Sequence, residues 1–212
     1  MKVIVLKQGV HIDLGNEGNP DIMNKCKEIC GAVVLLKAEK QGEENIIVDT
    51  GNWGYEKEIL AALKKQGLKP ENIKWVINTH LHFDHHSNNY LFKKAKRLSL
   101  IGVWFPKKSA YWYKNKRDNF KEIPGIKILA TPGHVSDHIS VVVKSKGKTY
   151  VISGDAVQER YIKNSTGRVS KNYIKSAKKI VDIADAVIPG HGKIIQGDNL
   201  KELKKAVYKL EV

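Results

Sequence analysis

Short apolar runs recur along the whole chain, and polar turns rich in Gly, Asn and Lys separate them. Runs of this length with many β-branched side chains are typical of strands that are buried in a sheet. Turn residues such as Gln41-Gly42-Glu43 between the early runs indicate hairpin-like connections. The pattern predicts strands over Lys2–Lys7, Ala32–Lys37, Asn45–Asp49, Lys74–Asn78, Leu98–Val103, Lys127–Ala130, Ile139–Lys144, Thr149–Ser153 and Ala186–Ile188.

Longer segments place apolar residues three or four positions apart, which favours amphipathic helices. In the segment that begins at Glu56, the side chains of Ile59, Leu60 and Leu63 share one helix face. Strands and helices in this order predict an α/β (α+β) domain over residues 1–212, with two sheets in the middle and helices outside. The helices are expected over Glu56–Gln66, Asn88–Lys96, Lys171–Ala184 and Asn199–Leu210.

Seven of the eight His residues stand in three short clusters, and each cluster directly follows an apolar run. A fourth run ends in Gly154-Asp155. Loops past strand ends are common places for catalytic side chains. His11 stands outside the clusters, and we interpret it as an ordinary surface or core residue. The clusters read Thr79-His80-Leu81-His82-Phe83-Asp84-His85-His86, Thr131-Pro132-Gly133-His134-Val135-Ser136-Asp137-His138 and Pro189-Gly190-His191-Gly192.

The first cluster has the spacing of a metal site. His80 and His82 are two positions apart, so their side chains can point the same way in an extended loop. Asp84 and His85 follow after the chain starts to turn, so they can face a second ion. Burying these polar groups without partners would be unfavourable, which argues against an ordinary core segment. Imidazole and carboxylate ligands suit Zn(II), with Fe(II) or Mn(II) as substitutes.

The H-x-H-x-D-H segment resembles the signature of the metallo-β-lactamase superfamily. The T-P-G-H, S-G-D and P-G-H-G segments resemble the later motifs of that family, in the same order, over residues 33–193. The resemblance implies a four-layer αββα sandwich of two mixed sheets that binds two zinc ions, with Fe or Mn as alternatives. The ligands that it implies are His80, His82 and His134 for the first ion, Asp84, His85 and His191 for the second, and Asp155 for both.

Other positions resemble residues that support the ligands in that family. Asp49-Thr50-Gly51 resembles the family's D-T-G turn, whose Asp usually forms a hydrogen bond to a ligand His. Thr79 is expected to have a similar role, and His138 a structural or supporting one. Ser87 and Asp137 depart from the pattern, because the family commonly has Gly at both positions.

The resemblance implies a hydrolase in which a metal-bridging hydroxide attacks an ester, thioester or lactone of a small molecule. Asp84 would be catalytic, since its carboxylate could orient the nucleophile or pass a proton to the leaving group. His82 favours hydrolysis, because di-iron redox relatives often have Glu there, and many genuine β-lactamases have Cys where Asp155 stands. A phosphodiesterase or endoribonuclease acting on RNA is the alternative, and the complete ligand set argues against a non-catalytic binding protein.

Three aromatic residues are expected to line the substrate pocket. Trp53 and Tyr55 follow the D-T-G turn, and Tyr161 follows Asp155. Residues 104–114 mix aromatic side chains with Lys, and they either contribute to the pocket or pack under a helix. Aromatic side chains could cover an apolar substrate, whereas Lys could bind an anionic one.

The formal net charge is +15, and four of the 37 basic residues are Arg. Such a charge attracts anionic small molecules or RNA, although a Lys-rich surface of the kind found in thermophiles gives the same composition. If their segment were helical, Cys26 and Cys30 would share one face. They are expected to be free thiols, with a disulfide or redox role left open.

Two features of the chain bear on where the protein is found. No run of about 18 apolar residues that could span a membrane is present. The first residues also lack the pattern of a signal peptide, so we expect a cytoplasmic protein. A homodimer is an open expectation, because many relatives are dimers.

Overall fold

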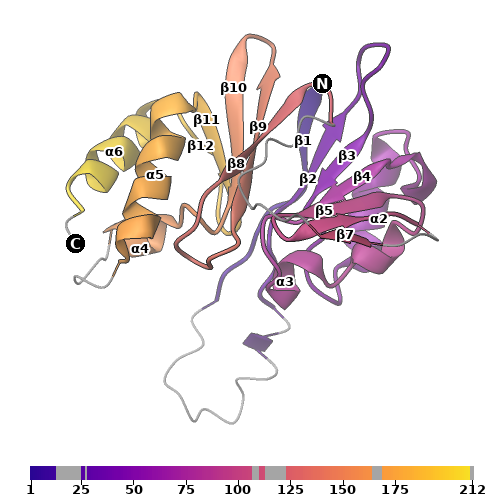
Figure 1. The fold of residues 1–212 in the computed structure, drawn as a ribbon, viewed down its shortest axis with the longest axis horizontal. Coiled ribbons are helices and arrows are strands. Elements are labelled where there is room, and N and C mark those ends of the chain that lie inside the picture. Colours follow the sequence, from indigo (N-terminus) through magenta and orange to yellow (C-terminus); the bar gives the residue numbers. More distant parts are fainter. Residues whose placement is uncertain (13–24, 27, 107–109, 113–122, 164–168, 211–212) are drawn as a thin grey trace.

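The computed structural model describes residues 1–12, 25–26, 28–106, 110–112, 123–163 and 169–210 of the chain. Two β-sheets pack face to face, and helices cover the outer face of each sheet (Figure 1). This four-layer αββα arrangement confirms the fold class that the sequence predicts.

The first sheet has seven strands, which follow one another in chain order across it. Strands β3, β4 and β5 are parallel, and the other neighbours are antiparallel. Their bounds are β1 Lys2–Lys7, β2 Val33–Lys37, β3 Ile46–Val48, β4 Trp75–Ile77, β5 Lys96–Ser99, β6 Gly102–Trp104 and β7 Ala110–Trp112.

The second sheet has five strands in the order β12-β11-β10-β9-β8. Only β10 and β11 are parallel neighbours among these strands. Their bounds are β8 Ile126–Ala130, β9 Ile139–Ser145, β10 Lys148–Gly154, β11 Ala186–Pro189 and β12 Ile195–Gln196. The helices are α2 Glu56–Lys65, α3 Phe83–His86, α4 Glu159–Lys163, α5 Lys171–Ile183 and α6 Asp198–Tyr208, with short 3-10 turns at Pro70–Asn72 and Asn89–Leu91.

Strand β2 shows why its sequence is an unbroken apolar run. Val34 and Leu36 point into the core between the two sheets, where they meet side chains of the second sheet such as Val141. Leu35 points the other way, into the core beneath α2, where Ile59 is fully buried. Alternate side chains of a strand face opposite sides of its sheet, so a strand covered on both faces has no polar side.

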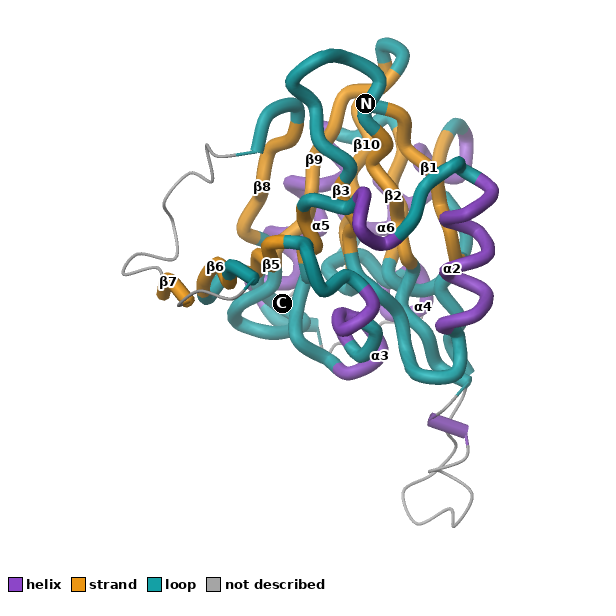
Figure 2. Tube along the Cα trace, turned by 90° about the vertical axis from the view of Figure 1, so that its right-hand side faces the viewer, coloured by secondary structure: helices purple, strands orange, loops and turns teal. Residues whose placement is uncertain are grey.

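The helices on the two outer faces lie on opposite sides of the molecule. Helices α4, α5 and α6 cover the five-stranded sheet, and α2 covers the seven-stranded one (Figure 1). Helix α5 begins after Ser170, whose side chain accepts a hydrogen bond from the backbone N–H of Tyr173. In Figure 2, with the molecule turned by 90°, neighbouring strands such as β1 and β2, or β8 and β9, run side by side.

Two predicted elements differ from the structure. The expected helix Asn88–Lys96 is a short 3-10 turn, and strand β5 begins at Lys96. The side chain of Asn89 bonds to those of Asn78 and Thr50, and polar side chains of this kind compete with the helical backbone. The expected strand Leu98–Val103 is two antiparallel strands, because the chain turns at residues 100–101.

Residues 104–114 do not form a single element. Trp104 ends β6, residues 110–112 form β7, and residues 107–109 and 113–114 lie outside the described part of the chain. Trp104 lines a surface hollow of about 420 Å³ together with Tyr90 and Phe105. None of the predicted metal ligands lines this hollow.

Parallel strands bring the predicted motifs to one edge of the sandwich. Val48 of β3 pairs with Ile77 of β4, so Asp49 and the H-x-H-x-D-H loop leave the first sheet together. In the second sheet β10 and β11 are also parallel, so their carboxyl ends lie side by side. Backbone hydrogen bonds join the two sheets at this edge, from Ile139 N–H to the Thr79 carbonyl and from Ala32 N–H to the Gly190 carbonyl.

Within the described residues, no helix is long and apolar enough to cross a membrane. The longest helix among them, α5, has 13 residues.

Candidate metal centre

The loop after β4 changes conformation within the H-x-H-x-D-H segment. His82 has an extended backbone, with φ −73° and ψ 142°, and helix α3 begins at the next residue. The extended part allows His80 and His82 to face one side, and the helical turn directs Asp84 and His85 to another. The two directions that the spacing predicts for these side chains therefore arise from one change of backbone conformation in a short loop.

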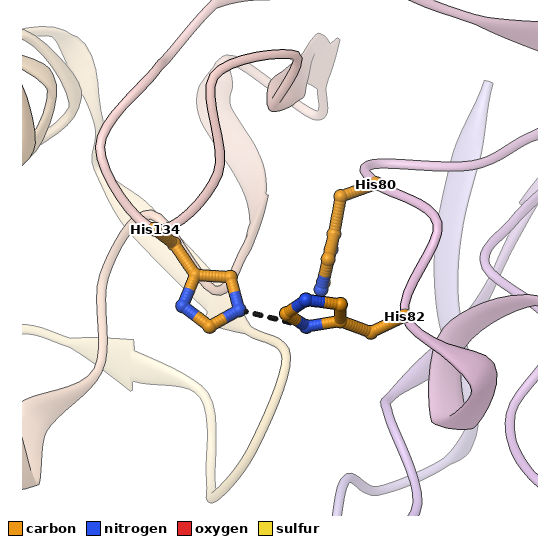
Figure 3. Close-up of side chains that lie close together, drawn as sticks. All are labelled: His80, His82 and His134. Atoms are coloured by element: carbon orange, nitrogen blue, oxygen red, sulfur yellow. Dashed lines mark hydrogen bonds between the residues drawn. The ribbon is translucent and has the colours of Figure 1, made fainter.

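The first group of donor atoms comes from His80, His82 and His134, which lie within 4.8 Å of one another. Figure 3 shows the rings of His80 and His82 approaching that of His134, which belongs to the loop after β8. Nε2 of His134 lies 3.0 Å from Nδ1 of His82. His80 is buried and His82 is exposed, so this group reaches from the interior to the surface.

The second group comes from Asp84, His85 and His191, again within 4.8 Å. Oδ2 of Asp84 lies 3.3 Å from Nε2 of His191 and 3.6 Å from Nε2 of His85. His191 follows β11 of the second sheet, whereas the other two residues belong to α3. The group therefore forms only because the two sheets meet at this edge.

The carboxylate of Asp155 lies between the two groups and faces each of them with a different oxygen. Its Oδ2 is 3.4 Å from Nε2 of His134 and 4.0 Å from Nε2 of His80. Its Oδ1 is 3.4 Å from Nε2 of His85 and 3.5 Å from Nε2 of His191. All seven residues that the resemblance implies as ligands are thus brought together at one place.

Three buried donor atoms at this place show whether its residues suit a metal ion. Nε2 of His80, Nε2 of His85 and Oδ1 of Asp155 are buried and have no hydrogen-bond partner. Buried polar atoms without partners are rare because they are unfavourable. Imidazole nitrogens and carboxylate oxygens are ligands for divalent metal ions. The residues present therefore suit a metal centre, and bound cations would satisfy the three atoms.

Hydrogen bonds on the far sides of the rings direct Nε2 of three His residues toward this centre. Nδ1 of His85 lies 2.8 Å from Oδ2 of Asp49, and Nδ1 of His191 lies 2.9 Å from the Val10 carbonyl oxygen. Both partners are acceptors, so Nδ1 carries the proton and Nε2 is left with its lone pair when the ring is neutral. Nδ1 of His80 similarly lies 3.1 Å from the Thr79 hydroxyl.

Asp49 organises this edge of the first sheet. Its Oδ1 accepts from the backbone N–H of Thr79 at 2.8 Å, and its Oδ2 accepts from the Thr79 hydroxyl at 2.7 Å. Because that hydroxyl donates to Asp49, it can accept from Nδ1 of His80. Asp49 itself has a φ of 54°, an uncommon conformation for a residue with a side chain. One carboxylate thus positions the rings of both His80 and His85.

His138 uses both ring nitrogens away from the donor groups. Its Nε2 accepts a hydrogen bond of 3.1 Å from the backbone N–H of Asp155, and its Nδ1 lies 2.9 Å from the Thr131 hydroxyl. Burial lowers the pKa of His138 to about 3, so the ring stays neutral and Nε2 remains an acceptor. This arrangement orients the Asp155 backbone.

Glycines allow the close packing around the centre. A Cβ on Gly31 would lie 2.7 Å from ring atoms of His85, and one on Gly190 would collide with Oδ1 of Asp155. Gly154 has a φ of 48° and would press a Cβ against the Thr79 hydroxyl. Gly154 and Gly190 stand beside the predicted ligands in the sequence, but no nearby motif distinguishes Gly31.

The acidic and basic groups of the centre shift one another's pKa. Burial disfavours the charged form of His85, yet the carboxylates of Asp155 and Asp49 raise its pKa well above the usual value. Burial acts in the same direction on His191, but Asp155 and Asp84 raise its pKa to about 9. The pKa of Asp155 is held well below its usual value against burial, by His85 and His191. Without a metal, protons on these two rings compensate the carboxylates.

The predicted substrate-lining residues are spread out. Trp53 is 64% exposed, and the Tyr55 hydroxyl donates to the Glu28 carbonyl oxygen at 3.0 Å. A pocket of about 440 Å³ opens beside His191, and residues 8–11 and 158–160 form its other walls. Neither Trp53 nor Tyr55 belongs to these walls. Tyr161 follows them directly in the chain.

His11 is the residue of this pocket that the sequence reasoning missed. Its ring lies edge-on to that of His191 at 5.7 Å, and its Nδ1 lies 3.0 Å from Nη1 of Arg160. It stands outside every motif, so nothing in the sequence distinguishes it from a surface residue.

One of the two departures from the family pattern, Ser87, is accommodated locally. Ser87 has φ −57° and ψ −30°, a helical conformation that does not require Gly, and its hydroxyl bonds to the Phe83 carbonyl.

Cys26 and Cys30 are free thiols, which confirms that expectation. Cys30 is buried, and burial raises the pKa of its thiol.

Comparison with known proteins decides the family. The sequence profile of the metallo-beta-lactamase superfamily matches residues 31–192. The chain belongs to the metallo-β-lactamase superfamily. It is 34% identical over 162 residues to a protein of Methanocaldococcus jannaschii named "Probable metallo-hydrolase", covering 73% of this chain and 74% of the relative. It is also 32% identical over 174 residues to metallo-beta-lactamase domain-containing protein 1 of Xenopus laevis, covering 76% and 70%.

Family and relatives together make this superfamily member a metal-dependent hydrolase. A match to an N-acyl homoserine lactonase of Bacillus cereus is shorter, with 28% identity over 108 residues, 46% of this chain and 43% of that lactonase. Among solved structures, a metallo-beta-lactamase family protein of Thermus thermophilus superposes with a TM-score of 0.63 at 17% identity, covering 96% of this chain and 78% of the other. The structural likeness concerns the fold alone.

Replacing Asp49 with Asn tests its organising role. Oδ2 of Asp49 accepts hydrogen bonds from both the Thr79 hydroxyl and Nδ1 of His85. If the NH₂ group of an Asn side chain occupies that position, it cannot accept either bond. We expect Asp49→Asn to lower the affinity for divalent metal by about tenfold to a hundredfold, measured by competition with a chromogenic chelator. Asp198→Asn is the matched control, because that side chain is 90% exposed. Equal affinities for the two variants would contradict the role.

Metal uptake should depend on pH in a defined direction. His191, with a pKa of about 9, carries a proton at neutral pH when no metal is bound, and Nε2 must lose it to bind a cation. We expect the affinity for metal to rise as the pH increases from neutral toward about 9. Titration calorimetry in two buffers of different ionisation enthalpy should detect proton release on binding. An affinity that is constant or falls over this range would contradict the assignment.

Proposed function

We propose that this chain is a dinuclear zinc hydrolase that cleaves an ester, thioester or lactone of a small molecule, with Fe or Mn as substitutes for zinc. The observation that carries the proposal is the position of Asp155, whose two oxygens face two separate groups of donors. A single mononuclear site would not need both groups. Paired metals that share a carboxylate are common in hydrolases.

The proposed ligands follow the two groups. His80, His82 and His134 would hold one ion, Asp84, His85 and His191 the other, and Asp155 both. Zinc, when bound, acts as a Lewis acid toward the substrate oxygen and lowers the pKa of water. Five imidazoles and two carboxylates form a donor set that suits this metal.

The chain's own residues hold the charged groups in place. Asp49 and Thr79 fix the ring orientation of His80 and His85, and His138 fixes the backbone of Asp155. Such hydrogen bonds keep donors in a productive geometry before substrate arrives.

Asp84 is the candidate for proton transfer. The pKa of its carboxyl group is lowered against burial, by the hydrogen bond with His191 and the charge of His85, so it is ionised at neutral pH. Its side chain is 9% exposed, which leaves it near the surface of the centre. An ionised carboxylate there can accept a proton and pass it to a leaving group.

The pocket beside His191 supports a small-molecule substrate. Its volume of about 440 Å³ is in the range of small-molecule sites, about 300–1,000 Å³. Its charged residues, apart from the histidines, are one Glu and one Arg, Glu159 and Arg160. The partial match to a lactonase supports the lactone among the proposed substrates.

An RNA phosphodiesterase is the second candidate, because a net charge of +15 favours polyanions. The described pocket has a mixed charge, which favours the small-molecule proposal. The two candidates are separated by the substrates that the protein turns over.

The metal content tests the dinuclear proposal. We expect about two zinc ions per chain by elemental analysis of the zinc-loaded protein, and fewer for His191→Ala, which removes a proposed ligand. His86→Ala is the control, because His86 belongs to neither donor group, and it should retain the wild-type content. A wild-type protein with one ion or none would contradict the proposal.

Turnover of a substrate panel tests the activity. The panel contains lactones, thioesters, bis(p-nitrophenyl) phosphate and labelled RNA, each with Zn, Mn or Fe. We expect hydrolysis of at least one lactone or thioester, and about a hundredfold loss of kcat/KM for Asp84→Ala, which lacks the proton acceptor. Asp198→Ala, at an exposed position, is the control.

Three outcomes of this panel are decisive. Metal-dependent cleavage of lactones or thioesters supports the proposal. Cleavage of RNA or the phosphodiester alone replaces it with the second candidate. No turnover with any of the three metals would indicate a non-catalytic binding protein.

A further inference from the structure

The pocket beside His191 contains one guanidinium that the proposed reaction does not use. Arg160 lies near the start of α4, and residues 8–11, which follow β1, also line the pocket. His191 and Gly192 complete the described lining, so the pocket begins at the metal centre. A substrate in this pocket would lie beside both His191 and Arg160.

Three hydrogen bonds hold the guanidinium in place. Nε of Arg160 donates to Oε1 of Gln158 at 3.2 Å, and Nη2 donates to the hydroxyl of Tyr161 at 2.7 Å. Nη1 donates to Nδ1 of His11 at 3.0 Å. The guanidinium also lies over the ring of Tyr161, with its central carbon 4.4 Å from the ring centre. An exposed Arg side chain is therefore fixed in one orientation.

None of these three partners is a carboxylate. Among the residues that the structure describes, no carboxylate forms an ion pair with Arg160, although Glu159 lies on the same pocket. A guanidinium has five N–H donors, and the three bonds leave one N–H on each terminal nitrogen. Two N–H groups on one positive group suit an oxyanion.

We infer that Arg160 binds a carboxylate or phosphate group of the substrate, while the scissile carbonyl lies at the metal centre. The inference rests on the proposed function, because it concerns which esters, thioesters or lactones the hydrolase prefers. Arg160 is a specificity residue in this scheme, and Gln158, Tyr161 and His11 position it.

The arrangement would discriminate in two ways. An anionic substrate gains charge-assisted hydrogen bonds from a group whose orientation is already fixed, so little side-chain entropy is lost on binding. A neutral substrate of the same shape would cover Arg160 and remove its water without supplying an acceptor. The preference should therefore appear as a difference in kcat/KM between an anionic and a neutral substrate of the same shape.

Two p-nitrophenyl esters form such a pair. Mono-p-nitrophenyl succinate ends in a carboxylate where p-nitrophenyl butyrate ends in a methyl group. We expect the zinc-loaded wild-type protein to have the higher kcat/KM for the succinate ester, and Arg160→Gln to lower this preference by about tenfold to a hundredfold, mainly through KM. Arg160→Lys keeps the positive charge but lacks the paired N–H groups of the guanidinium, so it should retain part of the preference for the succinate ester.

Lys201→Gln is the control for net charge, because it also removes one positive charge, from an exposed position on α6. This variant should keep the wild-type preference. A preference that is the same in Arg160→Gln as in the wild type, or that falls equally in Lys201→Gln, would overturn the inference.

A binding measurement separates this inference from the proposed function. The chain has four Arg residues, so the ¹⁵Nε–H signals of the arginine side chains are few enough to assign with Arg160→Lys. Monomethyl succinate should shift the Arg160 signal in a saturable manner, whereas methyl butyrate should not. A parallel titration with inorganic phosphate shows whether phosphate serves as well as carboxylate.

The two results are read independently. If neither these esters nor any lactone or thioester of the panel is hydrolysed but monomethyl succinate or phosphate shifts the Arg160 signal, the proposed function fails and the anion site stands. If esters are hydrolysed but neither anion shifts the signal, the anion site is wrong and the proposed function stands.

Discussion

The carboxylate of Asp155 is the constraint on which the centre depends. It is buried with a side-chain exposure of 5%, and four imidazole nitrogens surround its two oxygens. A charge in this position is tolerated only if positive groups compensate it, whether protons on His85 and His191 or metal ions. Every other feature of the edge serves to bring those groups to the carboxylate and to hold them there.

The architecture supplies the convergence. Donors come from the ends of β4, β8, β10 and β11. Three of these strands belong to parallel pairs, β4 with β3 in the first sheet and β10 with β11 in the second. Backbone hydrogen bonds between the sheets, such as that from Ile139 to Thr79, join the motifs directly. Gly31 and Gly190 allow this close approach, because a Cβ at either position would collide with His85 or Asp155. The site and the sandwich are therefore parts of one packing arrangement.

Hydrogen bonds beyond the donors form a second organised layer. Asp49 fixes His85 and, through Thr79, His80, whereas His138 acts on the Asp155 backbone. On the open side the pocket wall holds Arg160 through hydrogen bonds to Gln158, Tyr161 and His11. Asp49, Thr79 and His138 thus orient the donors, and Arg160 places a positive charge in the adjoining pocket. His191 belongs both to the pocket lining and to the donor groups.

The sequence predicted the layers from its strand-like runs. Its resemblance to the superfamily implied the donor set and the supporting Asp49, because motifs such as H-x-H-x-D-H and D-T-G can be read locally along the chain. The sequence did not determine the turn at residues 100–101 or the 3-10 turn at Asn89–Leu91, where contacts distant in the chain override local preference. His11 and Gly31 carry no local pattern. Their roles depend on segments that only folding brings together, since a ring contact or a missing Cβ acts through space rather than along the chain.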